Sequence, residues 1–249
     1  MNEVNKIPLR RWQSGFTLVE ISIVLAIFAL LVGGALTFLS SQRDIVHAKE
    51  TEKRLSEVRE ALIGFAMAYD RLPCPANTGS QGEENPRTGG ICASNAGFVP
   101  GVTLGIAPLN EEGFVIDAWG NPIRYAVTAV RNNTFTTTNA LKTEWLANNI
   151  PAIDPNDLQV CNSSAAISGA SCDTNARLAK SAVAVLVSTG KNGRSAVSPD
   201  ELNNLNNNKA FVSHTPSLPD SPLGEFDDIV IWLSPNVFFN RMITAGRLP

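Results

Sequence analysis

Residues 10–40 read RRWQSGFTLVEISIVLAIFALLVGGALTFLS, and this stretch decides how the rest of the chain is interpreted. A long apolar run follows two arginines and contains a single acidic residue, Glu20, near its start. An acidic side chain costs roughly 2.5–3.5 kcal/mol at the centre of a membrane-spanning helix, and less near an end. A carboxylate at this position is therefore expected to have a function.

Apart from Glu20, residues 16–39 carry no charge. About 20 apolar residues suffice to cross a bilayer, so the sequence predicts a transmembrane helix over this range. Lys6, Arg10 and Arg11 precede the run, and basic residues keep the adjoining end of a helix in the cytoplasm. We therefore expect the bulk of the chain to be exported and tethered by this helix.

A cleaved secretory signal is the simpler alternative. The apolar run is longer than the roughly 7–15 residues of a signal-peptide core. Residues 33–41, GGALTFLSS, supply only an imperfect small-residue cleavage site. This alternative would also leave Glu20 without a purpose.

The segment GFTLVE at residues 15–20, with the uncharged helix after it, resembles the N-terminus of type IV prepilins and of the pseudopilins of type II secretion. The resemblance implies that a dedicated prepilin peptidase cuts between Gly15 and Phe16. The leader at residues 1–15 would then be removed, and the new amine of Phe16 would be methylated.

The resemblance also gives Glu20 a role. After cleavage, the amine of Phe16 and the carboxylate of Glu20 are opposite charges near one depth of the membrane. In subunits stacked head-to-tail, the amine of one can pair with Glu20 of its neighbour, and a paired buried charge is penalised much less than a lone one. Head-to-tail contacts whose rotation does not close generate open filaments. We therefore expect Phe16 and Glu20 to direct filament assembly.

Residues 40–72 are predicted to continue the helix outside the membrane. This stretch is rich in helix formers and contains no proline before Pro73. From residue 55, apolar side chains recur three and four positions apart and form one stripe that can pack on a sheet. The stripe comprises Leu55, Val58, Leu62, Phe65 and Tyr69. Pro73 and Pro75 then end the helix.

Residues 73–249 are predicted to form one globular head. Residues 121–130 alternate between apolar and polar, as in a half-buried strand. Residues 181–188 and 228–234 are more continuously apolar, which predicts two more central strands. Ser234 and Pro235 are a suitable cap and first turn for a short closing helix. The expected fold class is α+β and pilin-like, with the long N-terminal helix packed on an antiparallel sheet.

Parts of the head also resemble pilin families. DAWGNPIRY (residues 117–125) resembles a turn and strand shared by major pseudopilins and many pilins, and DDIVIWLS (residues 227–234) resembles a late strand of the same families. LPCPA (residues 72–76) resembles a subset of long prepilin-like proteins, and the head is longer than that of a standard major pseudopilin.

The turn within DAWGNPIRY is assigned structural roles. Gly120 and Pro122 set the turn before the strand. Trp119 is expected to pack on the helix, and Asp117 to accept hydrogen bonds from the turn.

The four cysteines, Cys74, Cys92, Cys161 and Cys172, fit an exported protein, because none lies in a C-x-x-C pair. Four cysteines allow three pairings. Cys74–Cys92 with Cys161–Cys172 closes the shortest loops, and we favour it over the other two.

Charge and motif content exclude several function classes. The net charge is −3, and removal of the leader, whose charge is +2, leaves −5. An acidic chain without basic clusters lacks the positively charged patch that nucleic-acid binding requires. His47 lies on the helix and His214 in a loop, so a Ser-His-Asp arrangement has little support. We therefore expect no enzyme activity and no cofactor.

Asp227 and Asp228, beside the Asn- and Asp-rich segment at residues 198–208, are weak candidates for calcium ligands, since some major pseudopilins bind calcium in a late loop. No EF-hand spacing occurs here. The sequence favours a solvated acidic loop with no metal.

These patterns favour a subunit of a periplasmic or surface filament. A pseudopilin of type II secretion and a minor type IV pilin remain open. The implied partners are prepilin peptidase, other pilin or pseudopilin subunits, the inner-membrane assembly platform and the membrane itself. The predicted location is the inner membrane, with one pass and a periplasmic head, followed by the filament. The alternative is a membrane-tethered periplasmic binding or adhesive domain that does not polymerise.

Overall fold

A computed structural model of the chain describes residues 15–148, 157–195 and 197–249; the side chains of residues 33–41, 148 and 194 lie outside this description. The chain divides into two compact units, residues 1–45 and 46–249, which are described separately. The predicted leader falls on residues 1–15, of which residues 1–14 lie outside the described part.

Helix α1 (Leu18–Tyr69) begins in the first unit and ends in the second. In the first unit, the apolar side chains of residues 18–32 are exposed, from 41% at Val32 to 91% at Leu18. The helix ends where Asp70 adopts a positive φ of 56°, three residues before Pro73. A left-handed residue followed by a proline cannot continue a helix.

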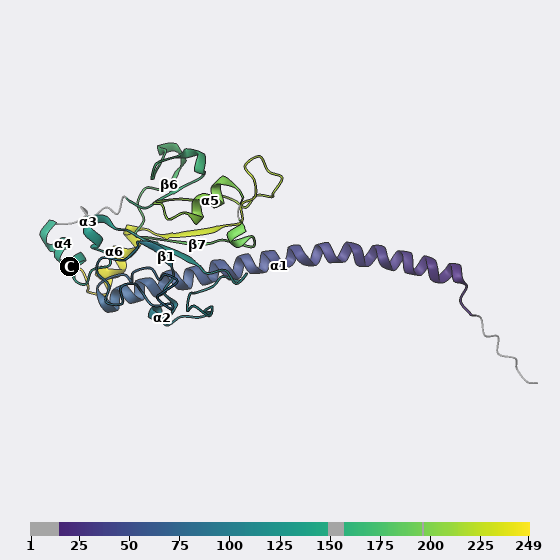
Figure 1. The fold of residues 1–249 in the computed structure, drawn as a ribbon, viewed down its shortest axis with the longest axis horizontal. Coiled ribbons are helices and arrows are strands. Elements are labelled where there is room, and N and C mark those ends of the chain that lie inside the picture. The colour runs from purple at the N-terminus through teal and green to yellow at the C-terminus, as the bar shows by residue number, and fades with distance from the viewer. Residues whose placement is uncertain (1–14, 149–156, 196) are drawn as a thin grey trace, which may run out of the picture. The chain divides into compact units, whose positions relative to one another are not determined.

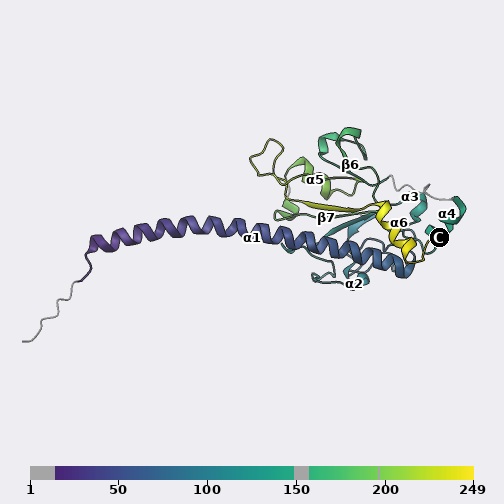
Figure 2. The ribbon, with the colours of Figure 1, turned by 180° about the vertical axis from the view of Figure 1, so that it is seen from behind.

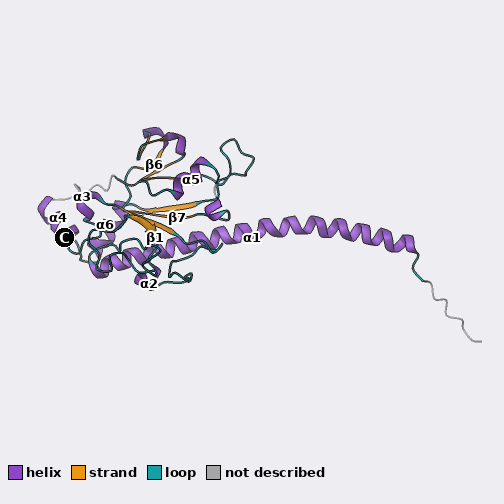
Figure 3. Cartoon of the chain, in the orientation of Figure 1, coloured by secondary structure: helices purple, strands orange, loops and turns teal. Residues whose placement is uncertain are grey.

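The second unit is built around a four-stranded sheet in the order β1-β2-β7-β9, and each neighbouring pair is antiparallel. Its strands are β1 (Ala96–Phe98), β2 (Arg124–Val127), β7 (Ala184–Ser188) and β9 (Ile229–Leu233). Figure 3 shows these strands above the part of α1 that belongs to the second unit, from residue 46 onward. The α+β prediction is confirmed: a long N-terminal helix is followed by an antiparallel sheet in a globular head.

One face of this sheet packs on α1. Leu55, Val58 and Leu62 of the predicted stripe are at most 1% exposed and share a core with sheet residues. The end of the stripe was predicted incorrectly: Tyr69 is 58% exposed, and Ala66 is buried in the core instead. At 100° per residue a stripe spaced three and four apart drifts around the helix, so the buried face shifts by one position over several turns.

The other face of the sheet is covered by a second sheet that the sequence did not predict. It has the order β6-β3-β8, with β3 and β8 parallel, and comprises β3 (Gln159–Cys161), β6 (Arg177–Ala179) and β8 (Ala210–Val212). Val160 and Phe211 pack with Val185 and Val187 of β7. Figures 1 and 2 show β6 and α5 on the opposite side of β7 from α1.

This second layer changes the interpretation of strand β9. The sequence predicted a central strand, but β9 lies at an edge of its sheet. Its residues alternate between two cores: Ile231 and Leu233 face the α1 side, whereas Val230 and Trp232 face the second sheet. A continuous apolar run here reflects coverage on both faces rather than a central place in the sheet.

Short elements complete the head. The helices are α2 (Gly101–Leu104), α3 (Val130–Asn133), α4 (Ala140–Asn148), α5 (Pro199–Leu205) and α6 (Pro235–Thr244); a hairpin joins β4 (Ile167–Ser168) to β5 (Ser171–Cys172). The predicted closing helix is α6, and the Ser234 hydroxyl accepts a hydrogen bond from the Val237 N–H at its first turn.

Candidate functional site

The predicted cleavage and assembly residues lie at the start of α1. Gly15 and Phe16 precede the helix, and the Phe16 side chain is 79% exposed. Thr17 is in the N-cap position: its Oγ1 accepts a hydrogen bond from the Glu20 N–H at 3.2 Å. The Glu20 carboxylate accepts one from the Thr17 N–H at 3.5 Å. These two bonds form a capping box.

The capping box gives Glu20 a second, local role that the sequence interpretation missed. The first N–H groups of a helix have no partner within it, and a carboxylate in the first turn also interacts favourably with the helix dipole. The pattern Thr-x-x-Glu at residues 17–20 is the sequence signal that would have revealed it. Any test of Glu20 must therefore separate helix capping from a role between subunits.

The predicted transmembrane span extends to residue 39, and the side chains of residues 33–39 lie outside the described part. Among the residues that the structure describes, no helix is long and apolar enough to cross a membrane.

In the second unit, the DAWGNP turn is organised by Asp117. One carboxylate oxygen accepts the N–H groups of Trp119 (2.9 Å) and Asn121 (2.8 Å). The other oxygen accepts the Ser188 hydroxyl at 2.6 Å. Gly120 has a φ of 88°, in the region that favours glycine, and its N–H bonds to the Asp117 carbonyl. Pro122 pairs with Ile116 as the chain leaves the turn.

The same turn is held against α1. Arg54 donates to the carbonyls of Ile116 (3.2 Å) and Asp117 (2.7 Å), and the Thr51 hydroxyl accepts the Ala118 N–H at 3.1 Å. The ring of Trp119 meets His47 edge-to-face, with centroids 5.8 Å apart. Residues on one face of α1 thus position the turn, and the turn connects α1 to strand β7.

The disulfides are the two favoured from the sequence. Cys74 is bonded to Cys92, and Cys161 to Cys172. The first lies beside a buried ion pair, in which Arg71 donates to both oxygens of Glu84 at 2.7 Å. Glu84 also accepts the Cys74 N–H at 3.1 Å. The disulfide and the ion pair together fasten the loop that follows α1.

The acidic loop is not solvated, which corrects the sequence interpretation. Asp228 is 5% exposed and Glu201, from α5, is fully buried. Carboxylate oxygens of Glu201, Asp227 and Asp228 lie within 4.8 Å of one another. Burial, together with the neighbouring carboxylates, raises the pKa of Asp227 to about 6 and that of Asp228 to about 8.

This cluster contains oxygens of the type that calcium prefers. The Asp227 Oδ1 atom is buried and has no hydrogen-bond partner among the described residues. The second Asp227 oxygen accepts the N–H groups of Lys191 and Asn192. Glu201 lies in the segment at residues 198–208 that the sequence placed beside Asp227 and Asp228, but only the fold identifies it as the third carboxylate, since it is on a separate helix 26 residues before Asp227.

Asp200 lies between a serine and a histidine, but not in the order that a catalytic triad needs. It accepts the Ser164 N–H at 2.7 Å and contacts His214 Nε2 at 3.0 Å. In a triad the histidine lies between the serine and the aspartate and takes the serine proton. Here the aspartate is central, so the histidine has no bond to the serine and the arrangement is structural.

Comparison with known proteins bears on the N-terminal segment. Residues 13–36 match the family model of the prokaryotic N-terminal methylation motif, so the chain carries the cleavage and methylation motif of type IV pilins and pseudopilins. In general terms, this motif indicates a pilin-like structural subunit rather than an enzyme. No curated protein and no solved structure matches the chain.

Proposed function

We propose that this chain is a subunit of a type IV pilus-like filament, cleaved between Gly15 and Phe16, methylated on Phe16 and assembled through Glu20. The observation that carries the proposal is the match of residues 13–36 to the methylation motif. The antiparallel sheet on a long N-terminal helix supports it, because it is the expected pilin-like fold.

The assembly step follows from charge pairing. Cleavage creates an amine at Phe16, four residues before Glu20. In a stacked filament, Glu20 accepts the amine of the neighbouring subunit while its apolar surroundings exclude water. Removing one partner of a buried ion pair costs about 3–5 kcal/mol, since the other charge is left uncompensated. The pair therefore fixes the register between subunits.

The first unit serves as the anchor before assembly. Residues 16–39 hold the subunit in the inner membrane, with the head in the periplasm, where the disulfides form. Prepilin peptidase removes the leader on the cytoplasmic side of the membrane, and an assembly platform transfers the subunit to the filament. The exposed apolar side chains of residues 18–32 are the surface that lipid and then neighbouring subunits would cover.

Two systems fit this function: a type II secretion pseudopilin and a minor type IV pilin. The DAWGNP turn fits both systems, whereas the length of the head favours a minor or unusual subunit over a standard major pseudopilin. A tethered binding or adhesive domain that never polymerises is the alternative, and Glu20 distinguishes it from both.

The test compares three variants for incorporation into sheared filaments or into cross-links with other subunits. Glu20→Gln keeps an acceptor for the capping box but removes the charge, so we expect normal membrane levels and strong depletion from filaments. Glu20→Ala removes both roles and should be depleted at least as much. Thr17→Val removes the capping hydroxyl and keeps the charge, so it should assemble nearly as well as the wild type, with helix stability lower by about 0.5–2 kcal/mol.

If Glu20→Gln assembles like the wild type while Thr17→Val does not, Glu20 acts only as a helix cap. If all three variants behave like the wild type, the tethered domain is the better description.

A further inference from the structure

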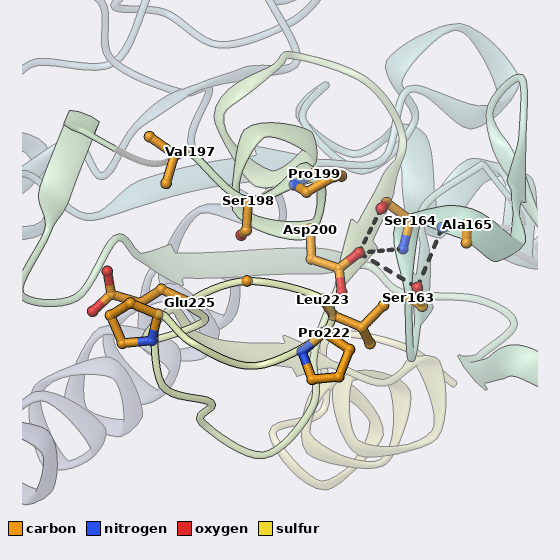
Figure 4. Close-up of a pocket in the computed structure, with 12 residues that line it drawn as sticks. Ser163, Ser164, Ala165, Val197, Ser198, Pro199, Asp200, Pro222, Leu223 and Glu225 are labelled. Atoms are coloured by element: carbon orange, nitrogen blue, oxygen red, sulfur yellow. Dashed lines mark hydrogen bonds between the residues drawn. The ribbon is translucent and has the colours of Figure 1, made fainter.

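A pocket of about 480 Å³ lies on the head, and no residue of the N-terminal motif is among those that line it. Its walls come from three segments: the turn at residues 163–165, the start of α5 at residues 197–200, and the loop at residues 219–225. The volume lies within the range of about 300–1,000 Å³ that is usual for binding sites. Figure 4 shows the side chains that line it.

The floor of the pocket is fixed. Asp200 is 3% exposed and is held by both Ser164 and His214, and the Ser163 hydroxyl approaches it at 3.4 Å. His214 stacks on Phe226 with ring centroids 3.8 Å apart. Because these polar groups are already bonded to one another, they offer little to a small polar ligand.

The loop that forms the third wall is also held in shape. Ser217 and Phe226 exchange backbone hydrogen bonds at its base, and the Ser217 hydroxyl donates to the Gly224 carbonyl at 2.8 Å. Pro219 and Pro222 restrict the segment between them. A rigid loop loses little entropy when a partner binds.

The exposed surface around the pocket is apolar. Val197 is 78% exposed and Leu223 is 59% exposed, and both line the pocket. Leu218, in the same loop as Leu223, is 78% exposed. Grouped exposed apolar side chains rimmed by polar residues mark interaction sites.

The charge at the pocket is of one sign. Glu225 lies at the opposite end from Asp200 and the two serines, and among the described residues it has no ion pair or hydrogen bond (Figure 4). Asp220 lies in the same loop. No lysine or arginine is among the described residues that line the pocket. Complementary charge therefore favours a cationic partner.

We propose that this pocket is a docking site for a basic segment of another protein, which inserts one apolar side chain between Val197 and Leu223 and places a lysine or arginine beside Glu225. This interaction is separate from the Glu20 contact in the filament. It would let an assembled or membrane-bound subunit bind a partner through its head.

The test pans a phage-displayed library of random peptides against the full-length chain in detergent micelles. We expect enrichment of peptides with a leucine, isoleucine or phenylalanine next to a lysine or arginine. A synthetic peptide of the enriched sequence should bind Leu223→Asn about tenfold more weakly, or worse, since that variant loses one buried apolar contact without adding a charge. Glu225→Lys should lose the preference for basic peptides.

Leu146→Asn is the matched control: Leu146 is 67% exposed but lies outside the pocket, so its replacement should leave peptide binding unchanged. Circular dichroism confirms that each variant is folded. The proposal is overturned if no sequence is enriched over Leu223→Asn, or if the enriched peptides are acidic or lack an apolar residue. It is also overturned if Leu223→Asn instead abolishes self-association, because the occupant would then be a second copy of this chain.

Discussion

At the scale of single residues, Asp117 and Asp228 are both buried carboxylates, but their surroundings differ. Burial raises the pKa of each. At Asp117, the Ser188 hydroxyl and the backbone of the turn stabilise the charged form and offset part of that effect. Asp228 has the Asn204 amide at 2.8 Å, and it faces the carboxylates of Glu201 and Asp227. The same residue type thus fixes a turn in one place and holds a proton in the other.

The raised pKa values predict a pH dependence of stability. A carboxyl with a pKa of about 8 in the folded state and an ordinary pKa near 4 in the unfolded state binds its proton more tightly when folded. The contribution of this carboxyl to the stability of the head is therefore full below about pH 4 and is lost as the pH rises to about 8. Asp228→Asn keeps an acceptor for the Asn204 amide and removes the titrating carboxyl. The variant should therefore have a higher thermal midpoint than the wild type at pH 8 and nearly the same midpoint at pH 5.

Thermal unfolding of the full-length chain, followed by circular dichroism at both pH values, measures this effect. Lower stability of Asp228→Asn than of the wild type at pH 8 would contradict the assignment. The same experiment tests the calcium candidates: a bound cation replaces the protons, so calcium should raise the midpoint more at pH 8 than at pH 5. If the thermal midpoint with calcium equals the midpoint with chelator at both pH values, Asp227 and Asp228 are not calcium ligands.

At the scale of elements, apolar patterns in the sequence identified the longer strands that are covered on both faces, but not the strands of three residues. Residues 181–188 and 228–234 were predicted as strands and contain β7 and β9. Strands β3, β6 and β8 have only three residues each, and one of their pairings joins segments about 50 residues apart in parallel. A run of three residues shows no period. The sequence also could not show that a second layer makes an edge strand apolar on both faces.

The ion pair that fastens the loop after α1 gives a prediction at this scale. Glu84→Gln keeps an acceptor for the Cys74 N–H but leaves the Arg71 charge buried without a counter-charge, which should cost about 3–5 kcal/mol. Adding Arg71→Met removes the buried charge, so the double variant should be more stable than Glu84→Gln alone.

Chemical denaturation of the full-length chain, followed by tryptophan fluorescence, gives both free energies. The double variant should recover a large part of the loss, because replacing a buried pair by neutral groups is often nearly neutral. Additive losses in the double variant would show that the two side chains do not act as a pair.

At the scale of the whole molecule, the N-terminal motif was easier to recognise than the groups in the head, because a processing motif is local in sequence, and residues 13–36 match its family model. The roles of Gly15, Phe16 and Glu20 within that motif stay predictions. The segment that holds Glu201 was a candidate, but Glu201 itself and the Asp200 pocket were not identified, because their partners come from segments that only the folded head brings together. The cysteine pairing could be predicted because the two disulfides in the structure are the ones that close the shortest loops.

The central claim, that this chain is a processed pilin-like subunit, is tested most directly by mass spectrometry of its N-terminal peptide after purification from cells that contain a prepilin peptidase. The account predicts a chain that begins at Phe16 and carries one methyl group on its amine, and that retains Met1 when the peptidase gene is deleted. A chain that keeps Met1 in the presence of the peptidase, or that begins near residues 38–42 as a cleaved secretory signal would, contradicts it.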